Sequence, residues 1–409
     1  MRRSIIDAPE WQEPAKRETL ELELELITPM FGGGYQTREV DRVLLIRPAA
    51  IRGHLRFWWR ATAGAQYTNP QLLYHAEANL WGGAAGQGEA SAGKASIQVE
   101  VTNQGKITPY EDIAPESKPK DGPLHGYFLF PFRGQGNTPA AYGLTGVKFR
   151  LKLVLDASLS AAEKQSVKNA LKAWITFGGV GARTRRGCGA LQPIGAHAQQ
   201  WLPPADPEQR QQWFSNLLPD IPEGPDAMPS LFGARYLFVK TSDDPLQVWG
   251  ELGRFWARFR KGHFNENYQP MKGGKWGDYR KVLCQLSGSE STLRLAKPYL
   301  GLPIVYQKLT GANFHETLEP AESGRMASPV ILKPVAFADR SIGGLIAVLK
   351  TPLPTKIKID SKFYTLEPPS KDDQVLAALG ANSVLEAVVK AAQQHFVNKV
   401  SVCTVGRQS

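Results

Sequence analysis

The sequence has few of the residues on which most enzyme chemistry depends. Its three cysteines, Cys188, Cys284 and Cys403, are too few and too far apart for a disulfide framework or a compact metal site. Its seven histidines are scattered, and none stands at metal-ligand spacing. It also lacks a Gly-x-Ser-x-Gly elbow and a cysteine paired with a motif histidine. We therefore expect no metal, no cofactor and no nucleophilic hydrolase.

Long apolar runs are missing as well. No segment approaches the length needed to cross a bilayer, and Asp7 and Pro9 interrupt any apolar core of a signal peptide. The low cysteine content is typical of a reducing compartment. The sequence thus predicts a cytoplasmic protein without a membrane partner.

Acidic residues are absent between Asp41 and Glu77, although the net charge of the chain is +11. Five arginines lie in this window: Arg42, Arg47, Arg52, Arg56 and Arg60. The last three recur every four residues, so they form one stripe on a helix that Pro48 opens. We expect these arginines to have no acidic partner nearby and to contact phosphates. A solvated basic helix face is the alternative reading.

Large aromatic residues accompany this stripe. Leu55, Trp58 and Trp59 can anchor the helix to a core, and Trp59 would stack on a base if it were exposed. His54 could serve as a general acid or base on a phosphodiester, but a packing role is the simpler reading. Asp41 could assist RNA cleavage, although a loop aspartate more often caps a turn or pairs with a cation.

A second basic element is the glycine-rich loop at residues 177–191. It contains neither a P-loop ending nor the Gly-x-Gly-x-x-Gly fingerprint, so a small-nucleotide site is not indicated. Its glycines allow positive φ and close approach to a ligand: Gly178, Gly179, Gly181, Gly187 and Gly189. Its three cations are Arg183, Arg185 and Arg186. We interpret it as a flexible loop that lies along a polyanion, with an ordinary surface loop as the alternative.

Hydrophobic periodicity predicts an α+β fold. Strands are expected at residues 20–26, 96–101, 147–155, 234–239, 330–337 and 344–349, and helices from Pro48 and at residues 71–81, 160–177, 246–259 and 383–397. This order favours antiparallel sheets with helices on one face, as in two ferredoxin-like (RRM-like) domains with long insertions. We place the domains at residues 1–200 and 230–409, joined by a proline-rich linker at 201–229. A weaker basic group in the second domain comprises Lys272, Lys275, Arg280 and Lys281.

Four segments in this order resemble a known family. They are the arginine helix at 46–60, Ala76-Glu-Ala-Asn-Leu-Trp-Gly82, Gly178-Gly-Val-Gly-Ala-Arg-Thr-Arg-Arg-Gly187 and Ala327-Ser-Pro-Val-Ile-Leu-Lys-Pro334. Together they resemble the first-numbered RAMP subunit of the type III-B CRISPR effector, the Cmr complex. The resemblance implies a non-catalytic subunit that caps the head of the complex at the 3′ end of the CRISPR RNA. Its partners would be CRISPR RNA, target RNA and other RAMP subunits.

Two alternatives remain open at this stage. One is a metal-independent endoribonuclease that processes CRISPR RNA with His54 or Asp41. The other is a general single-strand binder outside any CRISPR assembly. Both the resemblance and the basic elements favour a protein that binds RNA mainly by contacting the phosphodiester backbone of the RNA.

Overall fold

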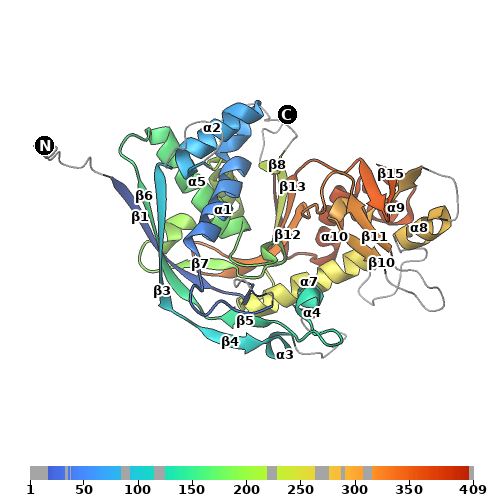
Figure 1. Cartoon of the computed structure of the whole chain (residues 1–409), viewed down its shortest axis with the longest axis horizontal. Coiled ribbons are helices and arrows are strands. Elements are labelled where there is room, and N and C mark those ends of the chain that lie inside the picture. The colour runs from blue at the N-terminus through green and yellow to red at the C-terminus, as the bar shows by residue number, and fades with distance from the viewer. Residues whose placement is uncertain are drawn as a thin grey trace, which may run out of the picture.

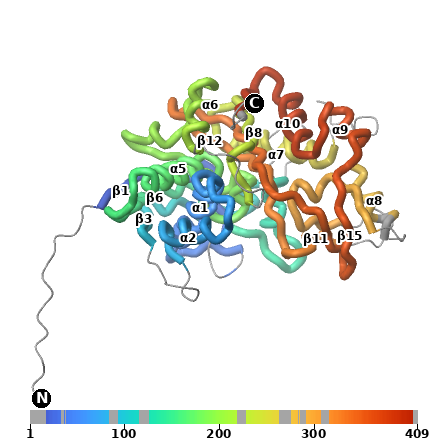
Figure 2. Tube along the Cα trace, turned by 90° about the horizontal axis from the view of Figure 1, so that it is seen from above, coloured from blue at the N-terminus to red at the C-terminus, as the bar shows by residue number. Residues whose placement is uncertain are grey.

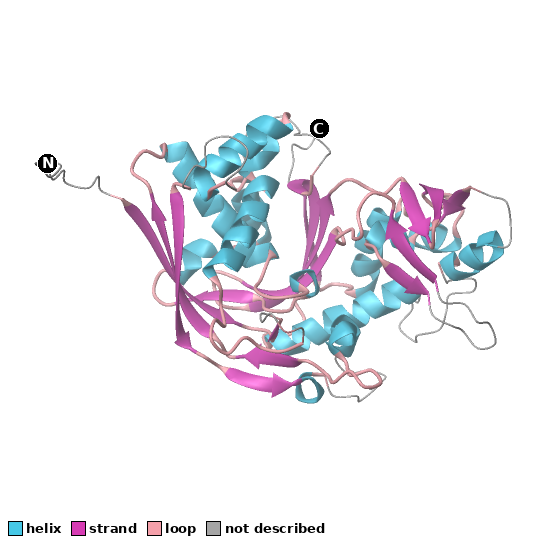
Figure 3. Cartoon of the chain, in the orientation of Figure 1, coloured by secondary structure: helices cyan, strands magenta, loops and turns pink. Residues whose placement is uncertain are grey.

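The computed structural model describes residues 17–32, 36, 38–83, 93–114, 125–218, 228–262, 276–286, 291–306 and 316–404. Helices and strands are mixed along the chain, and four separate sheets are formed (Figure 3). Antiparallel pairing dominates, and β9 with β15 is a parallel exception. The predicted α+β class with antiparallel sheets is confirmed.

The first sheet is built from residues before position 195. Its strands are β1 (Glu18–Leu26), β3 (Ala95–Asn103), β6 (Lys148–Leu155) and β7 (Leu191–Ile194), in the spatial order β3-β6-β1-β7. The strict alternation of leucine and glutamate in β1 puts its later leucines in the core, and Leu22 lies opposite Leu151 of β6. Two helices, α1 (Pro48–Ala61) and α5 (Ala161–Phe177), pack against each other on one side of this sheet (Figure 1).

The second sheet repeats this arrangement with later residues. Its strands are β8 (Ser230–Val239), β12 (Val330–Ala336), β13 (Ile342–Lys350) and β16 (Val400–Thr404), in the order β12-β13-β8-β16. Its helices are α7 (Pro245–Lys261) and α10 (Val384–His395). All residues of β12 are buried, as expected for a continuous apolar strand, and one of them is Lys333.

A further part of the chain was not predicted from the sequence. A five-stranded sheet consists of β9 (Thr292–Arg294), β10 (Ile304–Tyr306), β11 (Glu316–Pro320), β14 (Lys356–Ile359) and β15 (Lys362–Glu367). With α8 (Asp278–Leu286) and α9 (Gln374–Leu379), it lies at the end of the molecule away from α1 in both views (Figures 1 and 2). A small sheet combines β2 (Met30–Phe31), β4 (Lys106–Pro109) and β5 (Tyr142–Thr145).

The remaining helices are short, apart from α2. They are α2 (Pro70–Trp81), α3 (Tyr110–Ile113), α4 (His125–Leu129) and α6 (Pro207–Ser215), with 3-10 turns at Ala63–Gln66, Phe130–Phe132, Thr184–Arg186, Ala198–Trp201 and Lys297–Leu300. Helix α6 lies within the segment that we expected to be a linker. Its Phe214 ring stacks at 5.2 Å from Tyr236 of β8 and lies 5.5 Å from Phe177 of α5, so this segment packs between α5 and the second sheet.

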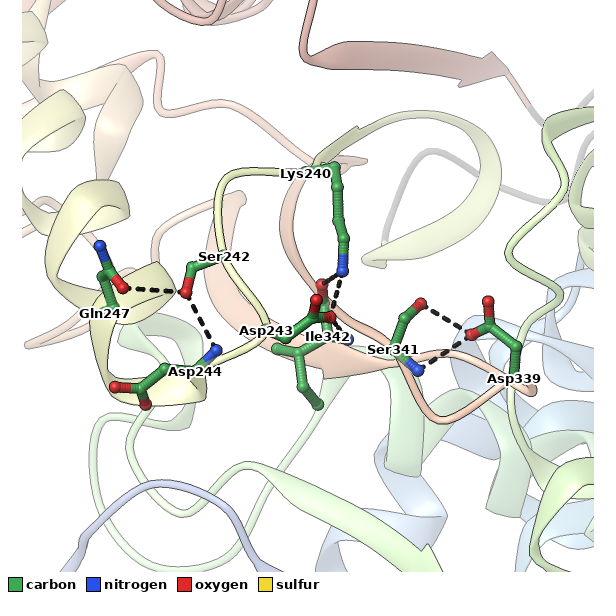
Figure 4. A network of polar contacts seen from close by, with 8 residues as sticks. All are labelled: Lys240, Ser242, Asp243, Asp244, Gln247, Asp339, Ser341 and Ile342. Atoms are coloured by element: carbon green, nitrogen blue, oxygen red, sulfur yellow. Dashed lines mark hydrogen bonds and ion pairs between the residues drawn. The ribbon is translucent and has the colours of Figure 1, made fainter.

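Polar contacts fix the start of α7 on the second sheet (Figure 4). Asp244 caps the helix by accepting from the Leu246 amide at 2.9 Å. The ammonium of Lys240 pairs with Asp243 and also donates to the Ile342 carbonyl at 2.8 Å. Asp243 in turn accepts from the Ile342 amide at 3.1 Å. Helix α7 therefore has a defined origin and direction relative to β13.

Candidate nucleic-acid interface

The arginine helix forms as predicted, and its apolar face is buried. Pro48 occupies its first turn, and Ile51, Leu55 and Trp58 lie in the core. Trp59 is 3% exposed, and its indole nitrogen donates to Ser166 Oγ at 3.0 Å. It therefore anchors α1 to α5, and the exposure on which its stacking role depended is absent.

The expectation that this helix has no acidic partner is wrong. Glu77 of α2 is 5% exposed at its side chain, and its Oε1 accepts from both Arg56 and Arg60. Asp41 pairs with Arg47. The two acids that border the acid-free window in the sequence thus supply the partners, because α2 folds back onto α1. The charge of Glu77 offsets one of the two guanidiniums that it binds.

Two arginines of this region remain available to a ligand. Arg42 and Arg52 are exposed, and neither forms a hydrogen bond or an ion pair with another residue in the described part of the chain. Arg52 begins the stripe, whose half-exposed members Arg56 and Arg60 keep further donors beyond those bound to Glu77. The surface of α1 is therefore still cationic, although less strongly than the sequence suggested.

The glycine-rich loop is packed inside the protein over most of its length. Gly187 and Gly189 have φ of +80° and +60°, which confirms the predicted left-handed backbone. A methyl group on Gly187 would lie 2.7 Å from Trp249 Nε1, and one on Gly189 would lie 2.0 Å from the Val180 carbonyl oxygen. These glycines are thus needed because other residues of the protein, and not a ligand, pack closely against the loop backbone. Gly178 and Gly179 are buried too, and the expected flexible loop is instead a packed one.

The three arginines of the loop have three different environments. Arg183 is exposed and adopts a left-handed backbone with φ of +58°. Arg185 donates to the Ser328 carbonyl, and its guanidinium lies 5.4 Å from the centre of the Phe57 ring on α1. Arg186 is buried, donates to the Val330 carbonyl at 2.6 Å and stacks on Trp256 at 4.8 Å.

These contacts bring the loop and the arginine helix together. Because Arg185 stacks on Phe57, the loop lies directly against α1, as the hypothesis of one basic surface requires. Burial lowers the pKa of Arg185 to about 10, and burial also holds the pKa of Arg186 well below its usual value. Arg186 is directed into the protein, so the expectation that it reaches a phosphate does not fit its position.

The sequence analysis missed a second buried cation, which lies on β12 and donates back toward the loop. The ammonium of Lys333 on β12 donates to the carbonyls of Ile175 and Gly178, each at 2.8 Å. Burial lowers its pKa to about 7. The available signal was a single lysine inside an unbroken apolar strand, with no acid beside it. The loop thus donates to β12 through Arg186, and β12 donates to α5 and the loop through Lys333.

His54 and Asp41 are engaged in structural contacts. The His54 ring lies parallel to the Trp174 ring at 6.4 Å, and burial lowers its pKa. Asp41 Oδ1 accepts from the amides of Val43 and Leu44 at 2.9 and 3.0 Å. These backbone hydrogen bonds, together with Arg47, lower the pKa of Asp41 to about 2. Asp41 is therefore ionised and holds the loop that precedes α1.

The basic group expected in the second domain lies apart from this surface. Lys272 and Lys275 fall outside the described residues. Arg280 is exposed on α8, next to the five-stranded sheet, and Lys281 pairs with Asp373. Figures 1 and 2 place α8 at the far end from α1, so the structure does not join Arg280 to the arginine helix.

Other chemistry is not evident in the parts of the chain that the structure describes. In these ranges no three His, Cys, Asp or Glu side chains gather as they would around a metal ion. None of the helices described there combines the length and the apolar character of a membrane span. Cys188 is buried, which raises the pKa of its thiol to about 12.

Comparisons with known proteins agree with the motifs. Residues 23–192 match the family model described as the RAMP superfamily. The crystal structure of apo Cmr1 from Pyrococcus furiosus is similar, with a TM-score of 0.50, 16% identity, and coverage of 82% of this chain and 89% of that chain. A subunit in the cryo-EM structure of the type III-B Cmr-beta complex with cognate target RNA, AMPPnP and ssDNA gives a TM-score of 0.46, 13% identity, and coverage of 93% and 100%. A search of curated protein sequences gives no match. Residues 23–192 are therefore similar to the RAMP superfamily, and the chain has a fold like that of Cmr1, in agreement with the resemblance seen in the sequence.

Proposed function

We propose that this protein is an RNA-binding subunit of a type III-B CRISPR ribonucleoprotein that acts in antiviral defence. The observation that carries the proposal is the convergence of two cationic elements from distant parts of the chain. Arg185 of the glycine-rich loop stacks on Phe57 of α1, which places the exposed Arg183 in the same region as the arginine stripe. An extended row of guanidiniums is suited to the phosphates of a single strand.

We further propose that the two main sheets belong to two ferredoxin-like domains. Each has the chain order β-α-β-β-α-β, with α1 and α5 in the first and α7 and α10 in the second. Each also has the same spatial strand order, in which the first and third strands are central. This agreement supports the predicted domains at residues 1–200 and 230–409, and α6 would pack within the segment between them.

The charge of the first sheet supports an interface on its helical side. In an RRM, RNA binds the open face of the sheet. Here that face carries Arg150 surrounded by carboxylates, with Glu21 at 3.2 Å, Glu23 at 3.3 Å and Glu100 at 2.8 Å. Because three carboxylates neutralise Arg150, the centre of this face is poorly suited to phosphates. RNA would therefore bind at α1 and the loop.

The place in the complex follows from the family resemblance. We infer that the subunit caps the head of the complex at the 3′ end of the CRISPR RNA, next to other RAMP subunits and the target RNA. The motifs at 46–60, 76–82, 178–187 and 327–334 and the Cmr1 fold support this role. We also infer a non-catalytic, cytoplasmic protein. The structural contacts of Asp41 and His54 favour this over the endoribonuclease alternative.

Binding of a labelled oligouridine at increasing salt concentrations tests the proposal. The double variant Arg52→Ala/Arg183→Ala removes two exposed cations of the interface. We expect a loss of affinity of at least about tenfold and a salt dependence that is shallower by about 1.4 in log–log slope. The matched control, Lys356→Ala/Lys362→Ala, removes two exposed cations of the five-stranded sheet and should leave binding unchanged.

Equal affinities for the two double variants would contradict the proposed interface. Gel analysis of the same reactions with a repeat RNA tests the enzymatic alternative. Cleavage products that disappear in the His54→Ala variant would favour the endoribonuclease.

A further inference from the structure

Strand β1 is paired over nearly its whole length on one side and over only part of it on the other. On the first side, β6 pairs with Glu18–Glu25. On the second side, β7 pairs with Glu23–Leu26 alone. Gly195, with φ of +91°, directly follows β7 and begins the turn by which the chain leaves the sheet. In the ranges that the structure describes, no strand pairs with residues 18–22 on this second side.

The backbone groups of this open part have a defined direction. The amide of Ile27, just after β1, donates to the Ala190 carbonyl at 2.9 Å, on the side of β7. Backbone groups alternate between the two sides of an antiparallel strand, so every second residue back from Ile27 directs its amide and carbonyl toward this side. The amides and carbonyls of Thr19 and Glu21 therefore point to the side on which the described chain provides no strand.

A pocket of about 190 Å³ lies against this open edge. Residues 21–23 of β1 form one wall, and the turn at 195–198 and Trp201 form the opposite wall. The inward-facing side chain of Leu20 is only half-buried, whereas Leu22, the next one along the same face, is 5% exposed. The apolar face of β1 is thus incompletely covered where its neighbouring strand is missing.

The other edges of this sheet carry features that oppose pairing. Strand β3, at one edge, has an irregularity in register between Val101 and Asn103. Strand β7, at the other edge, contains Pro193, which has no amide to donate. Bulges and prolines of this kind protect sheet edges from additional strands. Residues 18–22 contain neither feature, so this part of β1 is able to accept a further strand.

The charges beside the open edge indicate which strand fits it. The outward side chains of β1 there include Glu21 and Glu23, whereas the cations of this face, such as Arg150, lie on β6, one strand farther away. A strand added at the edge would therefore have carboxylates directly opposite its outward side chains. A second copy of β1 would bring its own glutamates to this face, and like charges across a strand pair are destabilising. Lysine or arginine at alternate positions would be stabilising.

We propose that residues 18–22 of β1 bind an extended, basic segment of another protein, which adds to the first sheet as an antiparallel strand in line with β7. Lysines or arginines at alternate positions of this segment face Glu21, and the apolar side chains between them cover Leu20 and enter the pocket beside Trp201. The site uses none of the residues of the proposed RNA interface, so the inference does not rest on the proposed function.

Labelled heptapeptides of alternating lysine and valine test the site by fluorescence anisotropy with the full chain. Because Glu21 would form a hydrogen-bonded pair with a lysine of the peptide, the lysine amides face β1 and the valine amides face away. Methylation of the lysine amide nitrogens, or replacement of the lysines by glutamate, should weaken binding by at least about tenfold. Methylation of the valine amide nitrogens is the matched control and should change the affinity by less than about twofold.

Variants of the protein test the same contact from the other side. Glu21→Lys should weaken binding of the lysine–valine peptide by at least about tenfold and strengthen binding of the glutamate–valine peptide. Glu100→Lys is the matched control, because Glu100 also pairs with Arg150 but lies on β3, away from this edge. It should retain the wild-type affinity. Urea unfolding of both variants establishes that the fold is intact, and hydrogen exchange should show that the peptide slows exchange of the Thr19 and Glu21 amides.

Several results would overturn the proposal. One is equal binding of the two methylated peptides, and another is equal binding by Glu21→Lys and Glu100→Lys. Slow exchange of the Thr19 and Glu21 amides without peptide would mean that the chain itself already pairs with this edge. Slower exchange at residues 18–22 with oligouridine, and not with the peptide, would assign the edge to RNA. If the wild-type protein binds the peptide but no oligouridine, the proposed function fails and this inference stands.

Discussion

Arg183 and Arg186 are three residues apart in one loop, yet they illustrate two uses of the same side chain. Arg183 is exposed, and Arg186 is 8% exposed with its donors on a carbonyl and its plane on Trp256. Lys333 resembles Arg186, since it is fully buried and donates to the backbone carbonyls of Ile175 and Gly178. A basic sequence window therefore contains both exposed cations, which are available to a ligand, and cations that hold the protein together. Burial and the nature of the acceptor distinguish them.

Replacement of Arg186 should produce the largest effect. Arg186→Ala leaves the Val330 carbonyl without its donor and uncovers the Trp256 ring. We expect the free energy of unfolding to fall by about 3 kcal/mol, since a buried charge-assisted hydrogen bond and a desolvated cation–π contact are lost together. Urea denaturation measures this. Arg183→Ala is the matched control and should change the stability by less than about 0.5 kcal/mol. Similar losses for the two variants would remove the distinction between them.

The pH dependence of stability tests the second buried cation. The pKa of Lys333 is about 7 in the folded protein and about 10.5 when unfolded, so the unfolded state binds more protons between these values. Stability should therefore rise as the pH increases through this window. We expect Lys333 to contribute a gain of about 2 kcal/mol between about pH 7 and about pH 9. Lys333→Met should lack this increment when both proteins are unfolded in urea. Parallel curves for the two proteins would show that the ammonium does not titrate there.

Replacement of Glu77 tests how much the exposed cations contribute to ligand binding, and we expect the smallest effect from it. Glu77→Gln keeps the shape of the residue that Arg56 and Arg60 contact but removes its negative charge. One additional positive charge near the interface should increase affinity for an oligouridine about threefold at low salt, and the gain should fade as salt is added. Anisotropy titrations would detect this change. Weaker binding by Glu77→Gln would instead mean that the pairing orients the arginines for the ligand.

The sequence predicted the parts of the fold that have strong periodicity. The helices at α1, α5 and α7 and the long strands of both main sheets agree with the expected ranges to within a few residues. The start of α5, where Ser160 and Glu163 form a capping box, also agrees with the helix predicted at 160–177, because caps depend on neighbours in the chain. Local patterns therefore sufficed where local interactions determine the structure.

The rest depends on contacts between distant residues. The five-stranded sheet is made of strands of three to six residues, and β9 pairs in parallel with β15, which follows 70 residues later. Such short strands leave too little periodicity to recognise. The contact of Glu77 with Arg56 and Arg60 requires α2 to pack on α1, and the burial of Arg186 requires α7 and β12. The candidate site could therefore be located from the sequence, but its available cations could not be distinguished from the buried ones.

The reciprocal contacts of Arg186 and Lys333 also restrict how the molecule can move. Separating β12 from the loop and α5 would expose carbonyls on both sides and would leave both buried cations without their acceptors. Hinge bending between the main sheets is therefore strongly opposed. A ligand that contacts both the loop and β12 would therefore meet one rigid surface, because these hydrogen bonds hold the two elements in a fixed relative position.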